Sequence, residues 1–312
     1  MPIDENTPDC IDIREDDLRE MSEEVLNTLL KDHTTGKNIF WATHDYEMLG
    51  SEYYYHSEIL PHLITGEHGM VIMPRVLKSK QQQTDRAKDM AEVFTPSWIC
   101  DAQNNLVEAS LRNSSPDGEV GRGLWQDYVR TTCLEITCGE APYLVSRYDT
   151  TTGEQIPMDK RIGLLDRKLR VVGENTETKD DWLQWAEIAY QNIYGYEWQG
   201  DNLLLAREAL LWTFIDYYQA KFSEDPAIEH IKNIAEIISW NLWQMDGLKG
   251  VVPDSCHSTT VVSGGLFEAK EEYVVPCAGC DKDDIRHHNG KYCKIRDWAN
   301  KGKKIRFIDL LQ

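Results

Sequence analysis

Three short apolar runs separated by longer amphipathic segments constrain the fold of this 312-residue chain more than any other feature. The runs cover residues 133–137, 192–197 and 237–242. Between them, helical periodicity predicts helices at about residues 178–191, 200–221 and 226–237. Strands that alternate with helices are typical of βαβ units with a parallel sheet. The pattern therefore predicts an α/β fold with a Rossmann-like sheet.

The flanking segments differ from this alternating region in composition. Residues 1–24 carry ten acidic side chains and two arginines, a net charge of −8, and lead into a helix predicted at about 15–31. A helical pattern at 84–110 is interrupted at 93–96, and a loop is predicted at 111–123. We therefore expect three regions, which are an acidic helical and mixed segment (1–83), a cofactor-binding domain (84–252) and a Cys-rich basic module (253–312).

Composition excludes several classes of protein. The chain has 53 acidic against 33 basic side chains, and its net charge of −20 disfavours non-specific nucleic-acid binding by the whole surface. No uncharged apolar run approaches the ~20 residues that cross a bilayer. The N-terminus lacks the basic and apolar regions of a signal peptide, and the cysteines are clustered. We therefore expect a soluble protein of the reducing cytoplasm.

Acidic residues mark the ends of the three predicted strands. In open α/β sheets, ligands bind beyond the carboxyl ends of the strands. Glu135 precedes a turn at Gly139, Glu197 precedes a helix, and Asp246 follows the third run. Glu197 is placed to accept hydrogen bonds from ribose hydroxyls, and Asp246 from an adenine amino group. Taken singly, a turn glycine or an exposed carboxylate explains each residue, but their order predicts an adenosine-type cofactor.

Four segments resemble, in order, the motifs of S-adenosylmethionine-dependent N6-adenine DNA methyltransferases. These are AEVFTP (91–96), the loop at 135–143, the block at 192–211 and NLWQMDG (241–247). The resemblance covers about residues 84–250, and the chain is similar to short bacterial and mobile-element proteins called restriction endonuclease subunit M. It implies that cofactor-binding residues are Phe94, Thr95 and Pro96 at the methionine end, Glu135 and Gly139 in the Gly-loop positions, Glu197 at the ribose, and Trp198 and Asp246 at the adenine.

The catalytic motif of that family is absent. Its Asn/Asp-Pro-Pro-Tyr/Phe loop holds the flipped adenine, whereas this chain contains no Pro-Pro dipeptide. Only 66 residues follow Asp246, too few for further catalytic strands and a target-recognition domain. The chain is then one part of a split methyltransferase that needs a partner chain, or an inactive relative that acts as a binding or anti-restriction factor. A third possibility is a different transfer reaction with Tyr143, Asp149 and Asp246 at the site.

Four cysteines near the C-terminus predict a structural zinc site. Cys277 and Cys280 form a Cys-x-x-Cys pair, with Cys256 before it and Cys293 after it, and such a turn aims both thiolates at one ion. Three histidines are alternative ligands, namely His257, His287 and His288. Free thiols or a redox pair are the competing interpretations.

The same region is basic. Residues 282–306 contain nine Lys or Arg against three Asp, a net charge of +6. A zinc module with a basic tail predicts a DNA contact, and a merely solvated terminus is the alternative. The acidic remainder of the chain suits a protein partner.

Overall fold

The computed structural model describes residues 15–89, 92–113, 125–263 and 271–311. The predicted acidic lead-in at 1–14 and most of the predicted loop at 111–123 lie outside this part of the chain. The fold is mixed α/β, and its central sheet is parallel with the order β1-β2-β3. The strands are β1 (Cys133–Glu135), β2 (Ile193–Glu197) and β3 (Leu242–Gln244). The mixed α/β class and the parallel sheet predicted from the alternating pattern are therefore confirmed.

Four helices connect and cover these strands. They are α6 (Leu164–Asn175), α7 (Lys179–Gln191), α8 (Gly200–Phe222) and α9 (Ile228–Asn241). Helix α8 is buried along most of its length, and its apolar residues are spread around the helix and not gathered on one face, so the amphipathic pattern expected there is not found. The predicted strand at 237–242 is largely wrong, because α9 continues to Asn241 and only then gives way to β3. A short buried apolar run fits either state, so periodicity alone does not place this boundary.

The N-terminal segment shares the hydrophobic core of the sheet. The single helix predicted at 15–31 is broken at Ser22, whose extended backbone separates α1 (Glu15–Met21) from α2 (Glu23–Leu30). Leu26 and Leu29 on α2 are fully buried in one cluster with residues of α6 to α9. Single-turn 3-10 helices follow as Glu47–Leu49, Ser51–Tyr53, Pro61–Leu63, Gly66–His68 and Arg75–Leu77. The next helices are α3 (Lys80–Asp89), α4 (Ser97–Asn113) and α5 (Trp125–Arg130), and the 3-10 turn Met158–Lys160 precedes α6.

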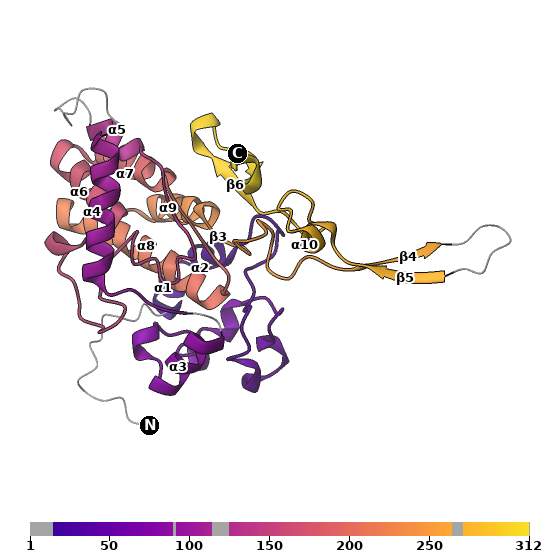
Figure 1. Cartoon of the computed structure of the whole chain (residues 1–312). Helices are drawn as coiled ribbons and strands as arrows, with labels where there is room; N and C mark the ends of the chain where they lie inside the picture. The colour runs from indigo at the N-terminus through magenta and orange to yellow at the C-terminus, as the bar shows by residue number, and fades with distance from the viewer. Residues whose placement is uncertain (1–14, 90–91, 114–124, 264–270, 312) are drawn as a thin grey trace.

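The C-terminal region consists of small elements. An antiparallel hairpin of β4 (Thr259–Ser263) and β5 (Glu271–Val275) projects away from the rest of the molecule (Figure 1). Next come α10 (Ala278–Lys282), β6 (Lys294–Asp297), the 3-10 turn Trp298–Asn300, β7 (Lys303–Arg306) and the 3-10 turn Phe307–Leu310. A second core cluster ties this region to β2 and β3 through Tyr196, Trp243, Met245, Val252, Cys293, Ile295 and Phe307. Among the described helices, none is both long and apolar enough to cross a membrane.

Candidate ligand pocket and metal centre

A pocket of about 1090 Å³ lies at the carboxyl ends of β1 and β2. Its wall includes the loop after β1 and the first residues after β2, which is where ligands bind in open α/β sheets. Six of the eight residues predicted to bind a cofactor line it, namely Phe94, Thr95, Glu135, Gly139, Glu197 and Trp198. The parallel pairing of β1 with β2 brings the four residues from Glu135 to Trp198 together, because it ends both strands at the same edge. Phe94 and Thr95 come from the segment before α4.

Glu197 ties the two strand ends to each other. Its Oε2 accepts a hydrogen bond from the backbone N–H of Gly139 at 2.8 Å, and its Oε1 accepts one from the N–H of Gln199 at 3.2 Å. Gly139 has φ of +55°, a left-handed conformation that favours glycine. A side chain there would also contact the Phe94 ring, which lies 3.5 Å from the position of a Cβ. The Glu197 carboxylate thus holds the loop after β1, which forms part of the pocket wall.

Glu135 has a carboxyl oxygen that nothing in the described chain satisfies. Its Oε1 accepts a long hydrogen bond from the N–H of Tyr143 at 3.4 Å, whereas the buried Oε2 has no hydrogen-bond partner. Burial raises the pKa of the Glu135 carboxyl well above its usual range, and it also raises the pKa of Glu197. Neither carboxyl forms an ion pair with a described residue. Two under-compensated acids in one pocket favour a ligand that brings hydrogen-bond donors and positive charge.

Aromatic rings complete the wall of the pocket. Phe94, Tyr143, Tyr55 and Trp198 all line it, and Lys88 is the one lysine or arginine among its described lining residues. Aromatic faces attract cations and stack on flat rings. A polyphosphate would instead face carboxyl groups with little cationic compensation, so the pocket disfavours polyanionic nucleotides.

A buried ionic network adjoins the pocket through Glu92, which lines it. The sequence patterns did not indicate this network. Asp201 in the first turn of α8 pairs with Arg86 at 2.9 Å and Lys78 at 3.3 Å, and Tyr46 donates a hydrogen bond to it at 2.8 Å. Arg86 also pairs with Glu92 at 2.6 Å. Although burial alone raises the pKa of Asp201, the two cations hold it below its usual range. The network fastens α3 to the start of α8, directly after Glu197.

Three residues proposed from the sequence lie outside the pocket lining. Pro96 immediately precedes α4, and its carbonyl accepts a hydrogen bond from the N–H of Ile99 at 2.9 Å. Asp246 caps a turn through the N–H of Leu248 at 3.0 Å and pairs with Lys249 at 3.1 Å. Asp149 accepts from the N–H of Ser97 at 2.8 Å. Each of these residues has a local structural partner, and none of them is part of the pocket lining, although Pro96 directly follows Thr95.

Three cysteines and one histidine form a compact cluster in the C-terminal region. The ligand atoms of Cys256, Cys277, Cys280 and His288 all lie within 4.8 Å of one another. The Sγ atom of each cysteine is 3.6 Å from Nδ1 of His288. A tetrahedral zinc ion with Zn–S of about 2.3 Å and Zn–N of about 2.05 Å places sulfur and nitrogen about 3.6 Å apart. The cluster therefore has the donor set and the spacing that a zinc ion requires.

Cys293, the fourth ligand proposed from spacing, lies elsewhere. It is fully buried in the second core cluster, and its Sγ contacts the carbonyl oxygen of Gln244 at 3.4 Å. His288 supplies the fourth ligand atom instead, which selects one of the three histidines proposed as alternatives. His287 turns away to Asp284 at 2.7 Å, and His257 is exposed.

Two glycines and a backbone amide shape the cluster. A Cβ on Gly279 would lie 2.6 Å from Nδ1 of His288, and a Cβ on Gly290 would lie 3.0 Å from Sγ of Cys256. The N–H of Asn289 donates to Sγ of Cys277 at 3.2 Å. Burial raises the pKa of Cys277, but hydrogen bonds from backbone amides, including that of Asn289, outweigh it and lower the pKa to about 6. Such a thiol is readily deprotonated, as a metal ligand must be.

The basic residues lie mainly on the β6–β7 hairpin, and some are engaged within the chain. Arg296 stacks over the rings of Trp240 at 4.6 Å and Trp298 at 5.2 Å, and Lys304 lies 5.0 Å from Trp240. Lys294 and Lys303 are exposed. Only part of the positive charge in this hairpin is therefore available to a partner.

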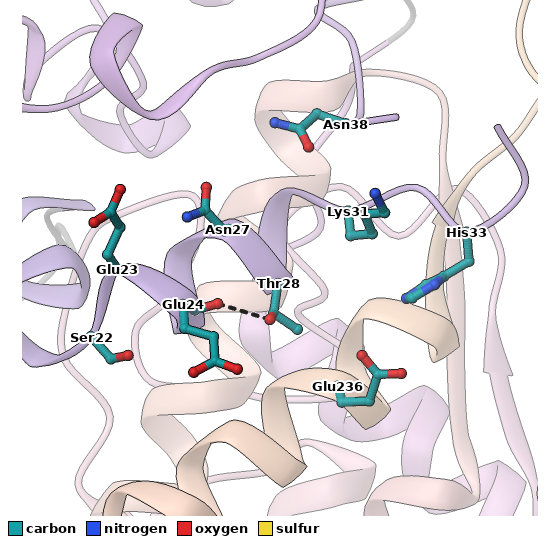
Figure 2. A pocket seen from close by; sticks show the side chains of 9 residues that line it. All are labelled: Ser22, Glu23, Glu24, Asn27, Thr28, Lys31, His33, Asn38 and Glu236. Carbon is teal, nitrogen blue, oxygen red and sulfur yellow. Dashed lines mark hydrogen bonds between the residues drawn. The ribbon is translucent and has the colours of Figure 1, made fainter. Parts of the chain in front are cut away.

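A second hollow, beside α2 and α9, is open and polar (Figure 2). Several of its lining side chains have partners within the chain. Thr28 donates to the carbonyl of Glu24 at 2.8 Å, and the Glu24 carboxylate pairs with Lys232 at 2.7 Å. The ring of His33 contacts Ser239 at 2.8 Å and stacks on Trp240. These contacts indicate a solvated surface depression.

Comparisons with protein-family models, with curated protein sequences and with solved structures find no match to this chain. Inference about function therefore rests on the geometry of the pocket and of the cysteine–histidine cluster.

Proposed function

We propose that this chain binds S-adenosylmethionine in the pocket at the ends of β1 and β2. In this proposal it is an adenine-N6 DNA methyltransferase-like subunit of a restriction-modification type system. The observation that carries the proposal is the gathering, in one acidic pocket, of six residues selected from sequence motifs alone.

The chemistry of the pocket supports this ligand over other nucleotides. S-adenosylmethionine carries a sulfonium, an ammonium and a carboxylate group, so it is cationic overall. A bound cation would favour the ionised forms of Glu135 and Glu197, against the burial that raises the pKa of each carboxyl. The unpartnered Oε2 of Glu135 can accept from the ammonium group, and the Glu197 oxygens have lone pairs left for ribose hydroxyls. Trp198 offers a ring to the adenine, and Phe94 offers one to the sulfonium end.

A protein partner is part of the proposal because the chain has no Asn/Asp-Pro-Pro-Tyr/Phe loop. The partner would supply that loop and the target recognition. In the described part of the chain, β1 pairs only with β2, and its other edge has no strand partner. At that edge Leu134 is 43% exposed and Ile136 is 63% exposed, and both residues line the pocket. The competing function is a catalytically inactive binding or anti-restriction factor on the same fold.

We further propose a structural zinc ion at Cys256, Cys277, Cys280 and His288, supported by the 3.6 Å spacing of sulfur and nitrogen. Zinc would cross-link the loop that carries Cys256, the start of α10 at Cys277 and Cys280, and the loop that carries His288. The neighbouring β6–β7 hairpin is the proposed DNA contact. Replacing the exposed Lys294 and Lys303 by Gln should weaken DNA binding and reduce its salt dependence.

Calorimetry with S-adenosylmethionine tests the ligand. We expect binding by the wild-type chain and at least about a tenfold loss for Glu197→Gln, which removes a charge while keeping the shape of the side chain. Glu177→Gln changes an exposed carboxylate outside the pocket and serves as the matched control. Absence of binding by the wild type, or equal binding by the Glu197 variant, would contradict the proposal.

Transfer of tritiated methyl groups to DNA tests the activity. We expect incorporation only when the product of a neighbouring gene supplies the missing loop. If the chain binds the cofactor but no methyl group is incorporated with or without the neighbouring gene product, the inactive binding factor would be favoured.

A further inference from the structure

A chain of hydrogen bonds joins the ligand pocket to the metal cluster. Nε1 of Trp198 donates to the hydroxyl of Tyr55 at 2.9 Å, and this hydroxyl donates to Oδ2 of Asp254 at 2.8 Å. Trp198 and Tyr55 both line the pocket. Asp254 precedes Cys256, a ligand of the cluster, by two residues. The two sites are thus connected through three side chains.

The position of Asp254 depends on the loop that carries His288. The turn at 252–255 docks on Lys291 through two hydrogen bonds, from Val252 N–H to the Lys291 carbonyl at 2.8 Å and from Lys291 N–H to Ser255 Oγ at 3.0 Å. Asp254 itself has φ of +52°, a left-handed conformation that aspartate adopts in turns more readily than most non-glycine residues. A metal ion that cross-links Cys256 to His288 would clamp this turn from its far side.

The indole of Trp198 depends in turn on Tyr55. The backbone carbonyl of Trp198 is held by Gln244 on β3 at 2.8 Å, but Tyr55 is the hydrogen-bond acceptor for its ring N–H. Burial and the bond to Asp254 raise the pKa of Tyr55 to about 12, so the phenol stays protonated at neutral pH and keeps its donor. The ring of His44 packs against that of Tyr55, with 5.0 Å between the ring centroids.

From this geometry we propose that zinc occupancy sets the ligand affinity of the pocket. Tyr55 and Asp254 act as positioning residues that transmit the state of the cluster to the Trp198 wall. With zinc bound, Asp254 holds Tyr55 and Tyr55 holds the indole; without zinc, the turn at 252–255 loosens and the wall loses its support. This inference deepens the proposed function and rests on it.

The test compares zinc-loaded, chelator-stripped and zinc-restored full-length protein by calorimetry with S-adenosylmethionine. We expect zinc removal to weaken binding about three- to tenfold, the effect of losing one or two hydrogen bonds to the wall, and zinc addition to restore it. Tyr55→Phe should retain zinc, bind the ligand as weakly as the stripped wild type, and show no further loss on stripping. Tyr54→Phe, a change at the exposed neighbouring tyrosine, should behave as the wild type.

A second readout needs no ligand. In ¹H–¹⁵N spectra, the indole signal of Trp198, identified by its absence in Trp198→Phe, should shift on zinc removal in the wild type and stay unchanged in Tyr55→Phe. The indole of Trp182, buried in the core on α7, is the internal control for unfolding. An unchanged Trp198 signal, or equal affinity with and without zinc, would overturn the inference. If the Trp198 signal shifts on zinc removal but the protein binds no S-adenosylmethionine, the coupling between the metal cluster and the pocket wall would stand. The proposed function would then be wrong.

Discussion

The α/β core and the C-terminal region of this chain are stabilised in different ways. Around the sheet, large apolar side chains such as Leu26 and Phe214 are fully buried in one continuous cluster. On the β4–β5 hairpin, Val262 is 53% exposed and Val274 is 68% exposed, and a two-stranded hairpin is marginal by itself in water. The core is thus stabilised by hydrophobic burial, whereas the C-terminal region has one small apolar cluster and a Cys/His cluster that could bind a metal ion. The pocket is lined only by residues outside the C-terminal region, and hydrogen bonds from Trp198 to Tyr55 and from Tyr55 to Asp254 connect the two.

Removal of the proposed zinc tests most directly whether the two regions are stabilised in different ways. Structural zinc contributes an apparent binding free energy of about 10–16 kcal/mol in small zinc modules, so chelation or Cys277→Ser should expose residues 253–292 to protease. Far-UV circular dichroism should change little, because the helices of the core do not touch the metal. Cys293→Ser is the matched control and should retain one equivalent of zinc. Loss of zinc from that variant, with retention by Cys277→Ser, would contradict the ligand assignment.

Truncating the core should have the next largest effect, in the opposite region. Phe214→Ala on α8 removes a fully buried ring and should lower the free energy of unfolding by about 3–5 kcal/mol. Urea denaturation measures this loss, and metal analysis should find zinc content unchanged. Val262→Ala on the exposed hairpin should change stability by less than about 0.5 kcal/mol. A similar loss for both variants would show that the two regions do not differ as described.

A single methyl group should distort the metal cluster. Gly279→Ala would bring a Cβ within 2.6 Å of His288 Nδ1 and 2.7 Å of the Asp284 carbonyl. Because backbone cannot move aside easily, we expect zinc affinity to fall about 10- to 100-fold, as when groups that orient metal ligands are disturbed. A zinc competition assay measures the change. Gly173→Ala, in α6 where a Cβ has space, should leave zinc affinity unaltered.

The smallest expected effect on stability is that of replacing Glu135 in the pocket. This residue is proposed to bind the ligand, but its buried carboxyl destabilises the fold. The pKa of Glu135 is raised in the folded chain. Between the ordinary carboxyl pKa and the raised value, the folded state therefore binds more protons than the unfolded state, and the free energy of unfolding falls as pH rises through this range. Glu135→Gln should remove this dependence and stabilise the chain by about 1 kcal/mol at pH 7. The same change should weaken binding of a cationic ligand. Thermal melts across pH, paired with calorimetry, measure both; destabilisation by Glu135→Gln at pH 7 would contradict the expectation.

The parts of the site that the sequence predicted share a physical basis. A parallel arrangement of the two runs at 133–137 and 192–197 requires their ends to meet, so Glu135, Gly139 and Glu197 lie together. The Cys-x-x-Cys pair is local, and a tight turn aims both sulfurs the same way. In both cases a local turn or the geometry of the sheet is sufficient to predict that the residues lie together.

The parts that the sequence misplaced depend on how loops pack. Cys293 and His288 are both near Cys280 in sequence, and only the packing of Cys293 against β3 leaves His288 at the cluster. Asp246 fits a motif for a ligand-binding acid, yet the turn after β3 uses it as a cap. The hydrogen bond between Tyr55 and Trp198 joins residues 143 positions apart, which no local pattern reveals.

Sequence patterns alone predicted the mixed α/β class, the parallel sheet, the acidic strand ends and three of the four clustered metal-ligand candidates. These follow from periodicity, from the edge at which parallel strands end and from a local turn. Only the tertiary structure decided that His288 replaces Cys293, that Asp246 stays outside the pocket lining, and that Tyr55 connects Trp198 to Asp254. Side-chain direction in loops is set by packing between segments distant in the chain, and spacing along the chain does not encode it.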